Sequence, residues 1–335
     1  MIRRQVPSFF HALRSGTQRQ LEGINPLRLQ QKGTRTKAIF ALGVVCFLWG
    51  TTWLASKEGV RHMPALQLAG IRQLIGGSLY LIYFLIRGTA LPRLKELGPL
   101  LVLALLNFIF SNGLSTWGVK FISAGLASII GAIFPLWIVV IGLFRGSERI
   151  PLKAIAGLVL GFAGVCIIFY EHLEDFLVPD FRLGIALSLI ATWTWALGSL
   201  YTKQQAAKFN PYFGLGFQMV LAGAMLFGIS TFDPNYLPLQ NIPTASWLSI
   251  AYLVLFGSLF AFVAYLYALQ HLPTEQASIY AYVNPIVAVL LGAVLFEEKL
   301  TTLLMMGGLV TLYGVYLVNK AFKKISITTA ATENT

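Results

Sequence analysis

The chain has 335 residues, of which 56% are apolar and 11% are charged, and its formal net charge is +12. Soluble globular proteins carry about 25% charged residues, so this composition excludes an ordinary soluble domain and predicts an all-α membrane protein. The basic residues lie in a tail and in loops between apolar runs, which is typical of membrane orientation rather than of nucleic-acid binding. The lipid bilayer is therefore an expected partner, and nucleic acid is not.

Residues 1–38 form a polar tail that holds eight basic residues and a single acid, Glu22. A basic, acid-poor N-terminus is typical either of an organelle transit peptide or of a cytoplasmic tail near anionic lipid headgroups. Nothing in the tail resembles a cleavage site, which favours the cytoplasmic tail. We do not interpret it as a secretory signal, because no apolar segment of about 7–15 residues precedes the first span.

Ten apolar runs follow the tail, separated by turns that contain proline or glycine. A helix needs about 20 apolar residues to cross the hydrocarbon layer of a membrane. The runs lie at roughly 39–56, 65–86, 99–118, 122–144, 153–170, 183–202, 211–232, 246–269, 275–296 and 302–319. We therefore predict ten transmembrane helices, followed by a second polar tail at 321–335.

The basic residues also predict which side of the membrane each loop faces. If the N-terminus lies inside, nineteen of the 25 basic residues fall inside, five fall outside and Arg72 lies within a span. Cytoplasmic loops carry an excess of Lys and Arg, so both termini are predicted to be cytoplasmic, most simply at a bacterial inner membrane. The acidic connection at 171–182 then falls outside and divides the chain into halves.

The two halves, 39–171 and 182–320, repeat one another. Both contain an apolar span with an internal proline and a terminal glutamate, so that Pro135 corresponds to Pro285 and Glu148 to Glu298. Further matches pair Trp49 with Trp195, Lys57 with Lys203, Gly70 with Gly216, Gly77 with Gly223, Gly157 with Gly307 and Gly164 with Gly314. Five spans per half is an odd number, which predicts two inverted five-helix repeats. Inverted repeats with interrupted helices in corresponding positions are typical of secondary transporters.

Four features together carry a resemblance to a known family. They are Trp49-Gly50 in the first span, Gly70-Ile71-Arg72 in the second, the duplicated helix with its proline and glutamate, and the matched glycine pairs in the last span of each half. Over about residues 39–320, the chain resembles the drug/metabolite transporter superfamily, in its ten-helix EamA-type branch. The resemblance implies a secondary transporter or exporter of small polar metabolites, such as amino acids and related compounds, that works by alternating access.

Arg72 is the only charged residue well inside a span, roughly 12 Å from the outer helix end at 1.5 Å per residue. A charge near the centre of a membrane helix costs about 2.5–3.5 kcal/mol, so such residues usually face the bundle interior and have partners. The guanidinium either recognises an anionic group of the substrate or hydrogen-bonds neighbouring carbonyls and amides in a structural role. Gln218 stands at the matching position of the second half, so a symmetric substrate site is not expected.

Aromatic and amide side chains within the spans are the other candidates for a substrate route. Pro285 lacks a backbone donor and frees the carbonyl of Ala281, and freed backbone at membrane depth is tolerated only against protein or a cavity. Pro135 and Pro285 are therefore predicted to interrupt their helices. The predicted substrate-binding residues are Trp49, Arg72, Asn112, Trp195, Tyr280 and Asn284.

Other residues have packing interpretations. Lys57 and Lys203 lie at helix ends, where they are either gates or, as we favour, snorkelling anchors. The glycine pairs predict close helix contacts, within the monomer or across a homodimer. The cysteines, Cys46 and Cys166, are expected to pack within spans, and their number and spacing indicate no metal or cofactor site.

No Asp or Glu lies deep in any span, and the four histidines lie in the tail or at span ends. Transport is therefore either downhill or an exchange, or its coupling group lies near a surface, with Glu275 as first candidate. An intramembrane enzyme would need such acids, a base beside its nucleophile or a metal, so no catalytic residue is predicted. A nucleotide-sugar or sugar-phosphate carrier and a non-transporting membrane scaffold are the alternatives. The carrier would be expected to need several interior basic residues, and the scaffold leaves the repeat unexplained.

Overall fold

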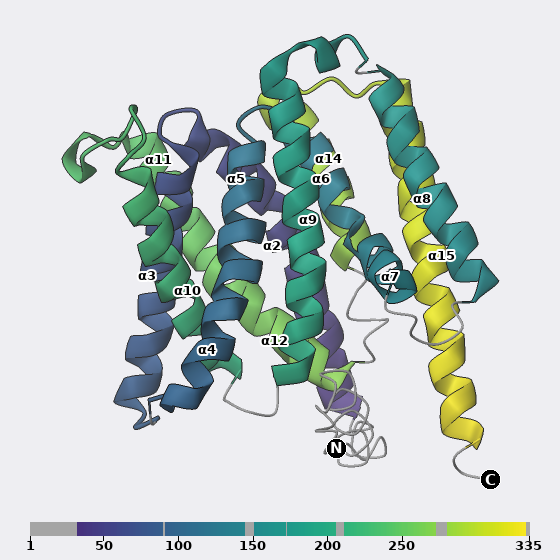
Figure 1. Ribbon diagram of the computed structural model, residues 1–335, viewed down its shortest axis with the longest axis horizontal. Coiled ribbons are helices and arrows are strands. Elements are labelled where there is room, and N and C mark those ends of the chain that lie inside the picture. The colour runs from purple at the N-terminus through teal and green to yellow at the C-terminus, as the bar shows by residue number, and fades with distance from the viewer. Residues whose placement is uncertain are drawn as a thin grey trace, which may run out of the picture.

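A computed structural model describes residues 32–89, 91–144, 151–171, 173–205, 211–272 and 280–332, and within these ranges every regular element is helical (Figure 1). The first half forms α2 (Lys32–Val60), α3 (Ala65–Ile86), α4 (Leu94–Leu103), η2 (Ala104–Gly113), α5 (Leu114–Gly118), α6 (Ala124–Ala132), α7 (Phe134–Phe144) and α8 (Leu152–Glu171). After η3 (Asp175–Leu177), the second half forms α9 (Pro179–Gln205), α10 (Pro211–Ser230), η4 (Leu239–Asn241), α11 (Thr244–Tyr252), η5 (Leu253–Phe260), α12 (Ala261–His271), α14 (Tyr280–Phe296) and α15 (Thr302–Thr332).

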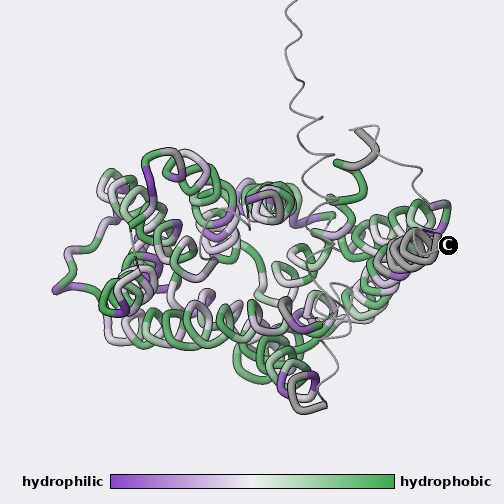
Figure 2. Tube along the Cα trace, turned by 90° about the horizontal axis from the view of Figure 1, so that it is seen from below, coloured by the Kyte–Doolittle hydropathy of each residue, from purple (hydrophilic) through white to green (hydrophobic). Residues whose placement is uncertain are grey.

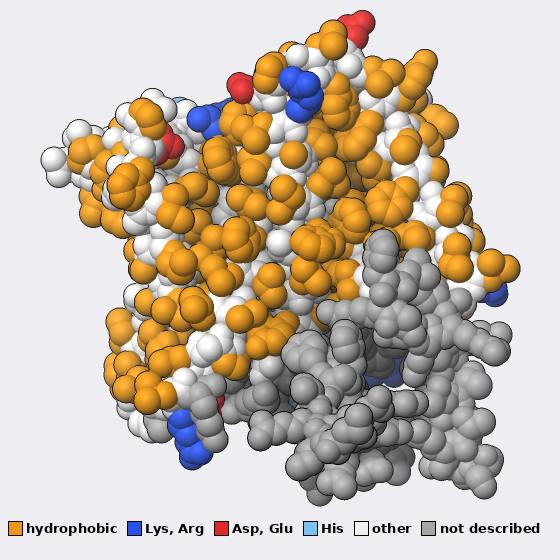
Figure 3. All heavy atoms as spheres, viewed as in Figure 1, with side chains coloured by type: hydrophobic (Ala, Val, Ile, Leu, Met, Phe, Trp, Pro, Cys, Tyr) orange, Lys and Arg blue, Asp and Glu red, His pale blue; other side chains and the backbone are white. Residues whose placement is uncertain are grey.

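Eight stretches of helix in the described residues are long and apolar enough to cross a membrane, and in order they match the first eight predicted runs. The apolar stretches Tyr280–Phe296 and Thr302–Val318 match the last two runs and are shorter. Hydrophobic side chains cover the middle of the face in Figure 3, with charged groups at its upper and lower edges. Figure 2 shows mainly hydrophobic residues along the helices as well. The chain is therefore an integral membrane protein, and ten spans stay a prediction.

Helices α3 and α10 pack against each other through glycines that the repeat matches. A Cβ atom placed on Gly77 would lie 2.7 Å from the backbone nitrogen of Val220, and one placed on Gly223 would lie 2.6 Å from that of Leu74. From Leu74 to Gly77 the residue number increases along α3, while the number of the contacting residue on α10 decreases from Gly223 to Val220. The two helices are therefore antiparallel. Larger residues at these positions would force the backbones apart.

Helices α8 and α15 form a second antiparallel pair of the same kind. A Cβ atom on Gly157 would lie 2.7 Å from the carbonyl oxygen of Gly314, and one on Gly307 would lie 2.6 Å from that of Gly164. Small residues let membrane helices approach closely. The structure thus uses these four glycines for packing within the chain.

Two stretches of π-helix, η2 and η5, occupy the third span of each half. The sequence predicts ordinary helices there, because no residue pattern distinguishes a π-helix from an α-helix. π-helices are rare and are frequently found at functional sites. Each lies in the middle of its span, which makes the neighbouring side chains candidates for a site.

The two repeat-related prolines have different surroundings. α6 ends at Ala132 and α7 begins at Phe134, so Pro135 lies in the first turn of a helix, where its missing N–H is tolerated. α14 continues through Pro285. The described backbone therefore has a helix boundary beside Pro135 and none beside Pro285. Residues 1–31, Glu148, Glu275 and the side chain of Lys203 lie outside the described part of the chain.

Candidate functional site

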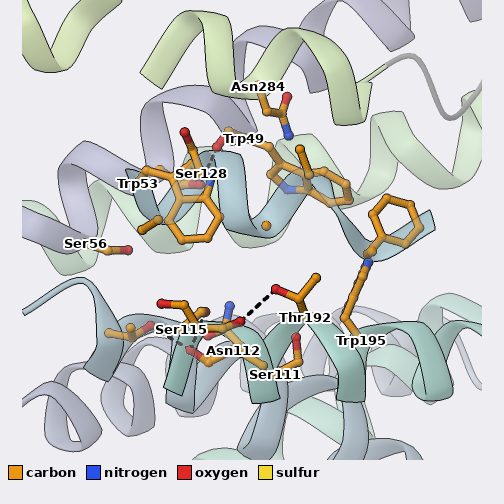
Figure 4. A pocket seen from close by; sticks show the side chains of 18 of the residues that line it. Trp49, Trp53, Ser56, Ser111, Asn112, Ser115, Ser128, Thr192, Trp195 and Asn284 are labelled. Carbon is orange, nitrogen blue, oxygen red and sulfur yellow. Dashed lines mark hydrogen bonds between the residues drawn. The ribbon is translucent and has the colours of Figure 1, made fainter. Parts of the chain in front are cut away.

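A cavity of about 170 Å³ lies between helices of the two halves. Its walls come from α2, α3, η2, α5, α6 and α7 of the first half and from α9, α12 and α14 of the second. Figure 4 shows the α2 side chains Trp49, Trp53 and Ser56 on one wall, across from Ser111 and Asn112 of η2. All six residues predicted to bind substrate line this cavity, as does Pro285, whereas Pro135 lies next to the lining residue Phe134.

Arg72 is 5% exposed and belongs to the lining. Its Nε donates a hydrogen bond to Ser258 Oγ at 3.2 Å. Gly257, the preceding residue on η5, has no side chain, and a Cβ atom there would lie 3.0 Å from an Arg72 guanidinium nitrogen. The described lining contains this one cationic side chain and no acidic one. An anionic group in the cavity would therefore meet a buried guanidinium without a competing carboxylate in those residues.

The same π-helix, η5, also positions Trp49. Its Nε1 donates to the carbonyl oxygen of Gly257 at 3.2 Å. Its ring centroid lies 5.0 Å from that of Tyr280 and 5.1 Å from those of Phe262 and Tyr265, within the range of favourable aromatic pairs. The rings of Trp49, Phe262 and Tyr280 line the cavity and form an aromatic wall that can contact apolar or cationic parts of a solute.

The aromatic wall continues into a buried apolar cluster that contains Tyr280. Ala38, Leu42 and Val45, from the beginning of α2, pack there with residues of α12 and α14, and Trp49 and Trp195 lie against them. This cluster packs around the beginning of α2, at the lower end of the bundle in Figure 1. Among the described residues, the cavity therefore meets apolar packing on that side.

Hydroxyl and amide groups cover the wall that η2, α5 and α9 form. Asn112 Oδ1 accepts a hydrogen bond from Gln73 Nε2 at 2.7 Å, and the Asn112 amide nitrogen has no partner among the described residues. Ser115 and Thr192 donate to backbone carbonyls of the preceding turn at 3.0 and 2.7 Å. Their oxygens can still accept hydrogen bonds, so this wall offers acceptors and an amide donor to a polar solute.

Asn284 joins two walls of the cavity. With its amide group oriented to match the neighbouring carbonyls, its nitrogen donates to the oxygen of Tyr280 at 3.0 Å and to that of Cys46 on α2 at 2.8 Å. The closeness of α2 and α14 is possible because Gly50 has no side chain, and a Cβ atom there would lie 2.6 Å from Val287 Cβ. Asn284 therefore holds helices together in addition to lining the cavity.

Sequence reasoning missed the residues that hold the lining in place. Gly257 and Ser258 stand as one glycine and one serine within an apolar run. Nothing in that sequence pattern indicates that they position Arg72 and Trp49. Lys57 is not a snorkelling anchor in the structure, because its Nζ donates to the carbonyl oxygens of Val119 and Ile122 at 2.9 and 2.8 Å. Its position at a helix end was visible in the sequence, but its partners were not.

The sequence profile of the EamA-like transporter family matches residues 36–170 and 182–320. The chain is 32% identical over 283 residues to the "Uncharacterized inner membrane transporter YedA" of Escherichia coli (strain K12), which covers 84% of this chain and 89% of the relative. It is 29% identical over 296 residues to the "Uncharacterized transporter YvbV" of Bacillus subtilis (strain 168), covering 86% of this chain and 93% of the relative.

A solved crystal structure has the same fold, with a TM-score of 0.60 and 19% sequence identity, over 85% of this chain and 97% of that one. This similarity concerns the fold alone. The family profile and the relatives named as transporters cover most of the chain in sequence as well. The chain therefore belongs to the EamA-like transporter family, within the drug/metabolite transporter superfamily.

Proposed function

We propose that this transporter is a secondary carrier of a small polar metabolite with a carboxylate or similar anionic group, such as an amino acid or a related compound. Arg72 carries the proposal, because it is buried in the cavity wall and has no acidic partner in the described lining. A guanidinium presents a planar fork of donors that suits a carboxylate. One cationic group suits one anionic group of the solute.

The rest of the lining favours a solute that also has an apolar or cationic part. The aromatic faces of Trp49 and Tyr280 lie at one end of the cavity, and the amide nitrogen of Asn112 lies on another wall. A small zwitterion could place its carboxylate at Arg72 and its remaining atoms against these rings. Polyanionic nucleotide sugars and sugar phosphates would need several cationic groups, and the described lining holds one.

The mechanism we propose is alternating access between two inverted five-helix repeats. The α3–α10 and α8–α15 interfaces support it. If the two halves are related by a two-fold axis, each contact between them implies a second contact in which the two partners are replaced by their repeat-related residues. The contact of Gly77 with Val220 and that of Gly223 with Leu74 are related in this way by the repeat. In such a fold, one repeat rocks against the other around a site at their interface. Both termini are then cytoplasmic, and the inner-membrane relative supports a bacterial inner-membrane location.

Flux measurements on proteoliposomes test this proposal. The panel contains labelled amino acids, other small carboxylates, their amide or ester analogues, and a nucleotide sugar. We expect flux of at least one carboxylate, and we expect the uncharged analogue of that carboxylate not to inhibit the flux. Flux of the uncharged analogues at the same rate would overturn the requirement for an anionic group. Flux of the nucleotide sugar alone would overturn the proposed substrate class. No flux of any solute would count against the proposal as a whole.

A further inference from the structure

Lys57 holds the end of α5 through three hydrogen bonds. Its Nζ donates to the carbonyl oxygens of Val119 at 2.9 Å, Lys120 at 3.3 Å and Ile122 at 2.8 Å. These carbonyls follow the last turn of α5, where backbone oxygens have no partner within the helix and the helix dipole is negative. The ammonium group has three donors, and each of them is used here.

Glu298 holds the beginning of α6 in the complementary way. Its Oε1 accepts from the backbone nitrogen of Ala124 at 2.7 Å, and its Oε2 accepts from that of Gly125 at 3.1 Å. These are the first residues of α6, where backbone donors lack helical partners and the dipole is positive. The N-cap residue Ser123 accepts from Leu126 at 3.1 Å. The short turn between α5 and α6 thus has a cation on one side and an anion on the other.

The chain is shaped to bring Glu298 to this position. α14 ends at Phe296, Glu297 has a positive φ of 55°, and the backbone nitrogen of Glu298 donates back to Gly292 at 3.2 Å. A Cβ atom on Gly292 would lie 2.6 Å from Glu298 Oε2. A larger residue at this position would therefore displace the carboxylate from α6.

The four helices that meet here all line the cavity. Ser56 precedes Lys57 on α2, Thr116 lies on α5, Ser128 on α6 and Asn284 on α14. Beneath the turn, Val119 and Ile122 are buried in the apolar core together with Leu54 and Val60 of α2. This is the end of the cavity opposite the apolar cluster at the beginning of α2. Glu298 comes from the second half of the chain, whereas α2, α5 and α6 come from the first.

We infer that Lys57 and Glu298 form a charged clamp, a pair of positioning residues that keeps this end of the cavity closed and releases when it opens. The inference rests on the proposed alternating-access function, because rocking of one half against the other must separate Glu298 from α6. The clamp suits a reversible closure, because water can solvate the two charges and the freed helix ends when it opens. An interface held by apolar packing alone would expose apolar surface to water on opening, without such compensation.

A reporter cysteine measures the opening directly and needs no substrate. In a background of Cys46→Ala and Cys166→Ala, Ser115→Cys places a thiol on the lining near the clamp. Proteoliposomes of this protein are treated with a membrane-impermeant maleimide on each side in turn. Glu298→Gln removes the negative charge at nearly the same size. Losing one charge-assisted hydrogen bond shifts an equilibrium about tenfold, so we expect labelling from the clamp side to be about tenfold faster.

Two further variants complete the experiment. Glu297→Gln is the matched control, since Glu297 is exposed and adjacent, and it should label at the parent rate. Lys57→Gln should accelerate labelling as Glu298→Gln does, and it provides the test if Glu298→Gln does not fold. Parent rates in the folded variants of both clamp residues would overturn the clamp, whether or not flux is found. Faster labelling in a protein that carries no solute would sustain the clamp and count against the proposed function.

Discussion

Gly77 and Gly223 make the same contact from the two sides of one helix interface. A Cβ atom on Gly77 would lie 2.7 Å from the nitrogen of Val220, and a Cβ atom on Gly223 would lie 2.6 Å from the nitrogen of Leu74. The repeat maps each of these contacts onto the other. A backbone cannot move away as a flexible side chain can, so both positions have room for hydrogen only.

Gly77→Ala and Gly223→Ala should therefore each destabilise the protein. Overpacking of a well-packed interface costs about 1–3 kcal/mol, and we expect losses of this size in the free energy of unfolding. Gly228→Ala, also on α10, is the matched control because, outside its own stretch of helix, no atom of the described residues lies within 4 Å of its Cβ position. Unfolding in detergent provides the measurement. Equal stability of Gly223→Ala and Gly228→Ala would contradict the close approach.

Arg72→Lys should impair transport more than membrane insertion. Lysine keeps the positive charge but loses the planar fork and the hydrogen bond from Nε to Ser258, and charge-assisted hydrogen bonds contribute about 1.5–3 kcal/mol. We expect the apparent KM for a carboxylate substrate to rise at least about tenfold, while the amount of protein in the membrane is unchanged. Arg182→Lys, at an exposed position, is the control. Parent kinetics in a well-inserted Arg72→Lys variant would assign Arg72 a structural role only.

Trp49→Phe tests whether the aromatic wall needs its hydrogen bond to η5. Phenylalanine keeps most of the ring but cannot donate to the carbonyl of Gly257, which accepts from Trp49 at 3.2 Å. A hydrogen bond of this kind contributes about 1 kcal/mol, so transport efficiency should fall about fivefold. Trp247→Phe, outside the cavity lining, should leave flux unchanged. If both variants transport like the parent, the position of the Trp49 ring does not depend on this bond.

The helices could be predicted from the sequence because each is a local signal, a long apolar run bounded by turn residues. Trp49, Arg72 and Asn284 could be singled out for the same reason, since a polar group inside an apolar run needs a partner or a cavity. Their shared cavity depends on helix packing, which the repeat indicates only in outline. The partners of Lys57 could not be predicted, because Val119 lies 62 residues away and offers a backbone carbonyl that any residue possesses.

Glu297 offers a prediction about stability that does not depend on transport. Its φ of 55° is in the left-handed region, which costs a residue with a Cβ atom about 1–2 kcal/mol and glycine almost nothing. Glycine also gains freedom in the unfolded chain, which offsets part of this difference. We therefore expect Glu297→Gly to be about 0.5 kcal/mol more stable than the parent.

Glu297→Ala is the appropriate control, because it removes the same exposed carboxylate but keeps the Cβ atom. It should be no more stable than the parent, and the difference between the glycine and alanine variants isolates the backbone conformation. Denaturant unfolding in detergent measures both. A glycine variant that is less stable than the alanine variant would mean that residue 297 does not adopt a left-handed conformation, and the path that leads Glu298 back to α6 would then be wrong as well.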